Sequence, residues 1–157
     1  ALEYFREISE LIEGTENRSM LLITRAYQAE AHWGIGDYAQ AEKVANQALA
    51  HARQADAPHH EALALNVLGK IYTARGEYAE AETIFREAIG IFERTGSRLE
   101  LGRALQNRAE LSISQADLEN AEMDYNRAIQ IFEEIGAPYD LEMARADFNR
   151  VMGSGST

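Results

Sequence analysis

The chain has 157 residues, 46% of them apolar, which is enough apolar material for a buried core. Its 26 acidic and 15 basic residues give a formal charge of −11, which would repel phosphates and therefore disfavours nucleic-acid binding. The chain has no cysteine, which excludes disulfides, thiol nucleophiles and cysteine-ligated metals, and we expect a cytoplasmic setting. We find no leader-like segment and no apolar run of about 18 residues, so we expect neither a signal peptide nor a membrane span.

A seven-residue motif, called the phrase below, recurs every 40 residues along the chain. It reads Gly-Asp-Tyr-Ala-Gln-Ala-Glu from Gly36, Gly-Glu-Tyr-Ala-Glu-Ala-Glu from Gly76 and Ala-Asp-Leu-Glu-Asn-Ala-Glu from Ala116. A fixed period of this length is typical of stacked repeat arrays rather than of one globular core. Function in such arrays usually resides on a surface.

Apolar residues spaced three or four apart predict helices throughout the chain. In chain order we expect eight of them, at about 1–13, 19–35, 38–55, 58–74, 78–95, 98–115, 118–135 and 139–152. Signals of helix start and end agree: capping-box spacing at Asp37 and Ser97, proline in the first turn at Pro58 and Pro138, and glycine after the last turn at Gly96 and Gly136.

The 40-residue period groups these helices into hairpins, because each phrase falls in the turn between two amphipathic helices. Small residues such as Gly69 and Ala81 let neighbouring helix backbones approach closely. We expect one array over 1–152, divided into a lone second helix at 1–18, full units at 19–57, 58–97 and 98–137, and a lone first helix at 138–152. Residues 153–157 read as a flexible linker or tail.

The second unit resembles the tetratricopeptide repeat. The matching residues are Leu68-Gly69, Tyr72, Ala81, Phe85 and Ala88. The resemblance covers residues 1 to about 152, and its unit of 40 residues is similar to the long repeats of kinesin light chains and of bacterial signalling proteins. It implies an all-α, right-handed solenoid of antiparallel helix hairpins whose first helices line a concave groove for a peptide or partner helix.

Counting from the Gly69 position predicts which first-helix side chains face that groove. The ligand-groove candidates are Tyr27, Glu30, Trp33, Asn66, Lys70, Arg103, Gln106, Asn107, Glu110 and Arg150. Amide side chains both donate and accept hydrogen bonds, which suits an extended peptide, and Trp33 with Tyr27 could form an aromatic anchor. The alternatives are that the polar residues are solvated without a ligand and that Trp33 packs in the core.

Other residue types that often carry chemistry do not form a site in this sequence. His59 and His60 are adjacent in a turn and point in different directions, so we expect no metal site. We find no nucleophile paired with a base and no phosphate-binding glycine fingerprint, and therefore expect no cofactor and no enzymatic activity.

The sequence thus predicts a non-catalytic scaffold that binds a protein or peptide as part of a larger regulatory or signalling protein. The acidic charge disfavours nucleic acid and suits a basic partner, and the alternative is that acidic solvent faces only keep the array soluble. We expect no membrane partner, because the chain has no long apolar run. A structural spacer or self-associating array is the alternative, because exposed apolar residues at the array's start could form a homodimer. These residues are Leu2, Phe5, Ile8 and Ile12.

Overall fold

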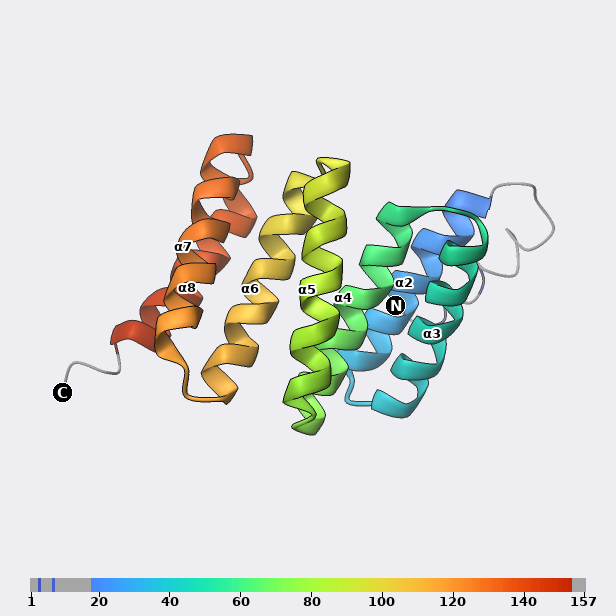
Figure 1. Cartoon of the computed structure of the whole chain (residues 1–157), viewed down its shortest axis with the longest axis horizontal. Coiled ribbons are helices and arrows are strands. Elements are labelled where there is room, and N and C mark those ends of the chain that lie inside the picture. Colours follow the sequence, from blue (N-terminus) through green and yellow to red (C-terminus); the bar gives the residue numbers. More distant parts are fainter. Residues whose placement is uncertain (1–2, 4–6, 8–17, 154–157) are drawn as a thin grey trace. The chain divides into compact units, whose positions relative to one another are not determined.

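The computed structural model describes residues 3, 7 and 18–153. This part of the chain forms seven α-helices, numbered from α2 as in Figure 1: α2 (Arg18–Gly34), α3 (Tyr38–Gln54), α4 (Pro58–Arg75), α5 (Tyr78–Thr95), α6 (Arg98–Ser114), α7 (Leu118–Ile135) and α8 (Pro138–Gly153). The all-α prediction is confirmed, and each of these helices begins and ends within one residue of its predicted bounds. The helix expected at 1–13 lies outside the described residues apart from positions 3 and 7.

The chain divides into two compact parts, residues 1–91 and 92–157, which are described separately below. In the N-terminal part α2 packs against α3 and α3 against α4, while in the C-terminal part α7 packs against both α6 and α8 (Figure 1). Within each part, consecutive helices are antiparallel, as a hairpin repeat requires. The single array over 1–152, its unit limits and its superhelical course stay predictions. Of the predicted tail, Gly153 is the last residue of α8, and 154–157 lie outside the described residues.

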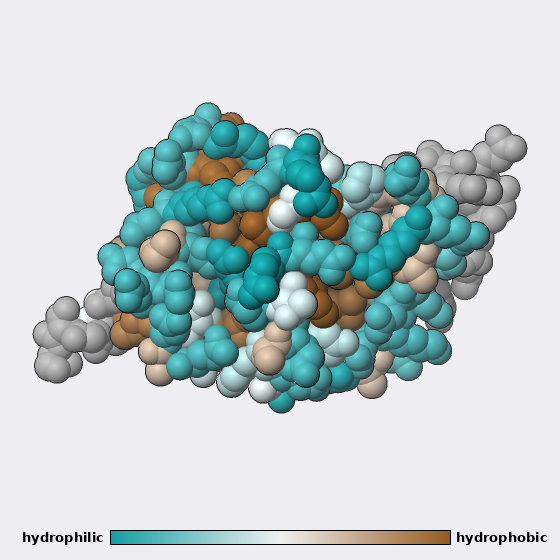
Figure 2. Space-filling model, in the orientation of Figure 1, coloured by the Kyte–Doolittle hydropathy of each residue, from teal (hydrophilic) through white to brown (hydrophobic). Residues whose placement is uncertain are grey.

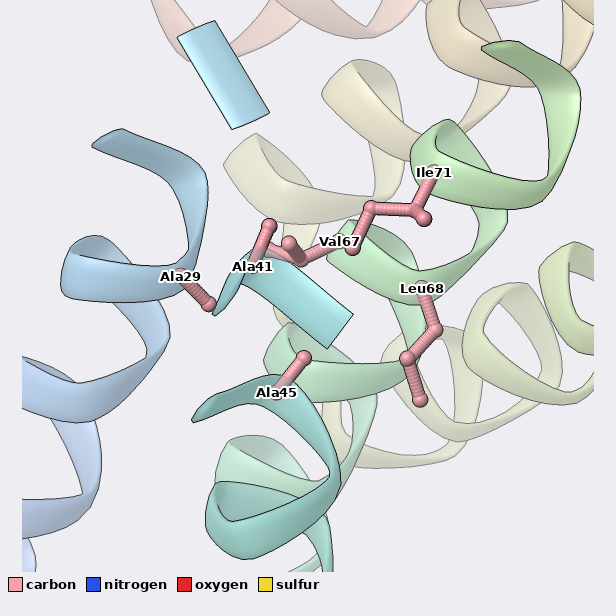
Figure 3. Close-up of a cluster of buried hydrophobic side chains, with 6 residues drawn as sticks. All are labelled: Ala29, Ala41, Ala45, Val67, Leu68 and Ile71. Carbon is pink, nitrogen blue, oxygen red and sulfur yellow. The ribbon is translucent and has the colours of Figure 1, made fainter. Parts of the chain in front are cut away.

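A buried cluster joins α2, α3 and α4 in the N-terminal part (Figure 3). Small side chains come from α2 and α3, and larger ones from α4; the members are Ala29, Ala41, Ala45, Val67, Leu68 and Ile71. The alanines allow α4 to approach closely, and burial of each larger aliphatic side chain contributes about 1.5–3 kcal/mol. This cluster fixes α4 beside α2.

Glycine residues make room for phenylalanine rings at two places. A Cβ atom added to Gly69 would lie 2.6 Å from the ring of the fully buried Phe85 in the N-terminal part. In the C-terminal part, a Cβ on Gly102 would lie 2.5 Å from the ring of Phe132. An aromatic ring therefore occupies the space that a side chain would take at each glycine, which agrees with the close approach predicted at Gly69.

A second buried cluster, Ala109, Ala121 and Tyr125, joins α6 and α7 in the C-terminal part. Phe148 of α8 packs against it, and its ring meets that of Tyr125 edge-on at 6.2 Å between centroids. Edge-to-face geometry is favoured by the ring quadrupoles. The cluster therefore holds α8 against the α6–α7 hairpin.

The turns repeat with the same period as the phrase. Residues Gly36, Gly76 and Ala116, at equivalent positions, have left-handed φ angles of 79°, 78° and 59°. A left-handed residue is a common way to end an α-helix, and glycine adopts it without a steric cost. Ala116 adopts it with a Cβ atom, so the third hairpin turn carries strain that the other two do not.

Aspartate side chains cap two of the second helices. Asp37 accepts a hydrogen bond from the backbone N–H of Gln40, as predicted, and Asp117 accepts one from the backbone N–H of Asn120. The Asn120 side chain also donates to Asp117, and these bonds hold the pKa of that carboxyl below its usual range. The cap predicted at Ser97 is wrong, because its hydroxyl makes no cap bond and pairs with that of Thr95 at 2.9 Å.

Hydrophilic residues cover most of the face shown in Figure 2, and hydrophobic residues show between them in smaller patches. Among the described helices none combines the length and apolar character needed to cross a membrane.

Candidate protein-interaction face on the first helices

The predicted groove residues all lie on the first helices of the hairpins, which are α2, α4, α6 and α8. In the N-terminal part α2 contacts α4 directly, although α3 lies between them in sequence. We call the predicted residues of these two helices the α2–α4 face; they are Tyr27, Glu30, Trp33, Asn66 and Lys70.

Lys70 connects the two helices of this face. Its Nζ lies 2.6 Å from Oε1 of Glu30 and 3.9 Å from the centroid of the Trp33 ring. The Lys70 side chain is only 12% exposed, whereas that of Glu30 is 45% exposed. The structure thus brings three predicted residues together around one ammonium group, which combines an ion pair with a cation–π contact.

Trp33 packs against the core, which is the alternative to an exposed aromatic anchor that its spacing left open. It is partly buried and packs against the core cluster of α2, α3 and α4, while its ring also lies under Lys70. Its indole N–H is shielded from solvent and has no hydrogen-bond partner among the described residues. Trp33 is therefore held by the core rather than standing free in solvent.

The two remaining residues of this face differ in accessibility. Tyr27 is 43% exposed, so its ring is available to a partner. Asn66 is only 8% exposed and already takes part in an interaction, so it offers a ligand far less surface than its spacing predicted.

In the C-terminal part, side chains of α6 reach across to α8. Arg103 donates from Nε to Oδ1 of Asp140 at 2.7 Å and from a second nitrogen to Oδ2 at 3.4 Å. Gln106 donates from Nε2 to Asp147 at 2.8 Å. Two-point contact with a carboxylate suits the planar guanidinium, so Arg103 is held more firmly than a single contact would hold it.

Glu110 forms a second connection at the far end of α6. It accepts a hydrogen bond of 2.5 Å from the hydroxyl of the buried Tyr125 and lies 3.6 Å from Arg150, which also contacts Asp147 at 2.8 Å. Burial, reinforced by the bond to Glu110, raises the pKa of Tyr125 well above its usual range. Asn107, the last candidate on α6, is partly buried and has interactions of its own.

Four of the predicted residues occupy one repeat position and alternate in charge. Glu30, Lys70, Glu110 and Arg150 are each 40 residues apart. Glu30 pairs with Lys70 in the N-terminal part and Glu110 with Arg150 in the C-terminal part. The alternation is visible in the sequence and could have predicted these pairs.

Sequence reasoning missed two further members of the C-terminal network. Tyr125 falls at a core position that Phe85 and Ala45 occupy in the other units, and a buried tyrosine hydroxyl normally requires a partner. Asp140 lies in the first turn of α8, where an acidic residue usually signals helix stabilisation rather than a contact with another helix.

Two surface depressions among the described residues are lined by residues other than the predicted groove residues. One of about 440 Å³ in the N-terminal part is lined by Tyr72, Ala79, Glu80, Thr83 and Ile84. The other, of about 560 Å³ in the C-terminal part, is lined by Phe92, Glu93, Gly96, Arg98, Leu101, Arg127, Gln130, Ile131 and Glu134.

The histidines of the α4 N-terminus do not belong to a larger cluster of ligands. The rings of His59 and His60 meet edge-on at 5.5 Å between centroids, and burial followed by the neighbouring His59 lowers the pKa of His60. Within the described part of the chain, no three histidine, aspartate or glutamate residues are grouped so that they could hold a metal ion.

Comparison with solved structures finds a similar fold in BtubC (BKLC) from P. vanneervenii, whose crystal structure superposes with a TM-score of 0.76 at 19% sequence identity. The match covers 96% of this chain and 63% of that one. A search of curated proteins finds no match. The tetratricopeptide repeat family model matches residues 20–94 and again residues 60–134, and no catalytic family is indicated. The 40-residue period, the helix hairpins and this match together establish that the chain belongs to the tetratricopeptide repeat family.

Proposed function

We propose that this chain is a non-catalytic module that binds a protein or peptide through its first helices, as part of a larger regulatory or signalling protein. Tetratricopeptide repeats typically mediate protein–protein interaction, which is the coarse function that the family match indicates. The finer proposal concerns which surface binds.

The observation that carries this proposal is the pairing of first helices. Lys70 joins α4 to Glu30 of α2 in the N-terminal part, and Arg103 joins α6 to Asp140 of α8 in the C-terminal part. Within each part, the paired first helices offer a mixed surface, which in the N-terminal part includes the exposed aromatic ring of Tyr27 and the charged pair of Glu30 and Lys70. Exposed aromatic residues beside fixed polar groups are the usual anchors of a protein interface.

The ion pairs of these faces also limit what a partner can gain. A ligand that contacts Lys70 or Arg103 must compete with a carboxylate already in place. We therefore expect the charged residues to select among partners, and the exposed apolar surface to supply more of the affinity.

The test is capture of binding partners with two matched double variants. Tyr27→Ala with Gln106→Ala alters the first-helix surface in both parts of the chain. The control, Asn46→Ala with Asn126→Ala, alters exposed residues of the second helices α3 and α7. We expect the first variant to lose partners that the wild type and the control retain, with circular dichroism confirming equal helicity. Equal capture by both variants would contradict the proposal.

Self-association is a second candidate, favoured by an exposed apolar pair on α8. Tyr139 and Met143, one helical turn apart, are 72% and 44% exposed. The apolar residues at the chain's start that first suggested a homodimer lie outside the described residues. Light scattering over a concentration series tests self-association. A mass that stays monomeric at high concentration excludes it.

A further inference from the structure

Lys70 fills a site on the α2–α4 face whose chemistry is that of a receptor for a cation. A tryptophan face and a carboxylate, here Trp33 and Glu30, are the two groups that recognise lysine and arginine side chains most effectively. We propose that Lys70 is an internal substitute for a basic side chain of the partner, and that Trp33 and Glu30 bind that side chain once Lys70 moves aside. This inference rests on the proposed function of the same face.

The geometry shows that one positive charge satisfies both groups together. The Lys70 ammonium lies 2.6 Å from the Glu30 carboxylate and 3.9 Å from the ring centroid of Trp33. The indole is fixed because Trp33 packs against the core cluster of the N-terminal part. A receptor of this kind is preorganised, since its aromatic wall does not depend on the cation for its position.

Exchange of one cation for another at this site requires the mostly buried Lys70 side chain to move out, while the Glu30 carboxylate keeps a cationic partner. Lys70 reaches the site on a flexible four-carbon stem and holds the partly exposed Glu30 through a single nitrogen. The incoming group replaces both contacts as it arrives, so the carboxylate is not left unpaired. An arginine side chain is a better ligand for this site than a lysine side chain, because its planar guanidinium stacks on an aromatic ring and can contact a carboxylate at two points.

The charge of the whole chain favours the same class of partner. With a formal charge of −11 the protein attracts basic segments, and Lys70 is one of only two lysines in the sequence. The Lys70 ammonium is thus a local positive charge placed where it shields an acidic and aromatic site. A basic peptide segment is the occupant that fits both the site and the overall charge.

The experiment uses a capped tripeptide, acetyl-Gly-Arg-Gly-amide, with acetyl-Gly-Gln-Gly-amide as its neutral counterpart. Trp33 is the sole tryptophan, so its fluorescence and its single indole N–H resonance report directly on this site. Lys70→Ala vacates the site, whereas Lys43→Ala removes the same charge from an exposed position on α3. We expect the arginine peptide to bind Lys70→Ala roughly tenfold more tightly than the wild type or Lys43→Ala. Adding Glu30→Gln to Lys70→Ala should abolish that gain.

Lys70→Gln provides a second variant that retains most of the stem, and its expected gain is in the same direction but smaller. An unchanged affinity for the arginine peptide in both folded variants, or an equal gain for the glutamine peptide, overturns the inference. Neither result affects the proposed function, which is tested separately by partner capture with Tyr27→Ala and Gln106→Ala. The two ideas can therefore fail separately.

Discussion

Ala116 shows at the residue scale how one position departs from its repeat. Its φ of 59° is left-handed, as at the equivalent Gly36 and Gly76. A residue with a Cβ atom is disfavoured there by roughly 1–2 kcal/mol, partly offset by the lower chain entropy of an unfolded alanine. We predict that Ala116→Gly raises the free energy of unfolding by about 0.5–1 kcal/mol, measured by urea denaturation.

The matched control for that substitution is Ala55→Gly. Ala55 ends α3 with a φ of −87°, an ordinary conformation for alanine, so glycine should bring no relief there and should slightly destabilise the protein. Equal effects of the two substitutions would show that strain at Ala116 is not the cause.

Tyr125 makes stability depend on pH in the alkaline range. Its pKa is raised in the folded state by burial and by the bond to Glu110, so the hydroxyl stays protonated after it ionises in the unfolded chain. Its contribution to stability is therefore complete below pH about 10 and falls as the pH rises, by at most about 1.4 kcal/mol per unit.

Tyr125→Phe should remove this dependence, and Phe85 shows that phenylalanine fits the equivalent position. Near neutral pH we expect the variant to be less stable by about 1–1.5 kcal/mol, because a hydrogen bond to a carboxylate is lost. Above pH about 10 the difference in the free energy of unfolding between the variant and the wild type should decrease. Urea denaturation across this pH range measures that difference. A difference that grows as the pH rises would refute the stabilising role of the Tyr125 hydroxyl.

An ion pair between α6 and α7 occupies a place that is apolar in the preceding unit. Arg108 donates two hydrogen bonds of 2.7 Å to the buried Asp124, whereas the equivalent residues 40 positions earlier are Leu68 and Ile84. Replacement of a buried ion pair by apolar residues of similar volume is often neutral or stabilising, whereas removal of one partner is costly.

We therefore predict opposite outcomes for a single and a double substitution. Asp124→Ala should lower the free energy of unfolding by about 2–3 kcal/mol, because Arg108 loses its carboxylate in a partly buried site. Arg108→Leu with Asp124→Ile should bring the stability back to that of the wild type or above it. Urea denaturation of both variants is the measurement. A double variant with a lower free energy of unfolding than the single variant would contradict the prediction.

At the scale of elements, ion pairs between second helices recur with their signs exchanged. Arg53 of α3 pairs with Glu87 in the N-terminal part, and in the C-terminal part Glu93 pairs with Arg127 of α7 at the same two repeat positions. A given position therefore accepts either charge, provided that the opposite charge faces it. These pairs help to fix the register of neighbouring helices.

Reversal of one such pair tests this account. Glu93→Arg should lower the free energy of unfolding by about 0.5–1 kcal/mol, because two partly exposed guanidinium groups would face each other. Adding Arg127→Glu should restore most of the loss, and high salt should reduce the difference because exposed charges are screened. The test is to measure the free energy of unfolding of the wild type, the single variant and the double variant at low and high salt. A double variant that recovers nothing would mean that the pair does not act through its charges.

The elements themselves were predictable because their signals are local. Helical spacing, proline in the first turn at Pro58 and the turn glycines repeat in phase, so every described helix lies within one residue of its prediction. Ser97 failed as a cap because a neighbouring hydroxyl, that of Thr95, offered its side chain another partner. Such competition depends on side-chain geometry that residue spacing does not contain.

The candidate site was predictable only in part. Residue spacing placed Glu30, Trp33 and Lys70 on facing helices, but their convergence on one ammonium depends on how closely α2 and α4 approach. Asn66 proved to be only 8% exposed, which its position on one helix did not indicate. Exposure and pairing are properties of the packed helices, so they follow from tertiary structure rather than from a single helix.

At the scale of the whole molecule, we propose that a partner binds the first helices and not the second. Photo-crosslinking tests it directly, with a photoreactive phenylalanine analogue placed at Tyr27 on α2 or at Asn46 on α3, both exposed. We predict that the analogue at Tyr27 becomes linked to the captured partner while the analogue at Asn46 does not. Linkage at Asn46 with none at Tyr27 would contradict the claim.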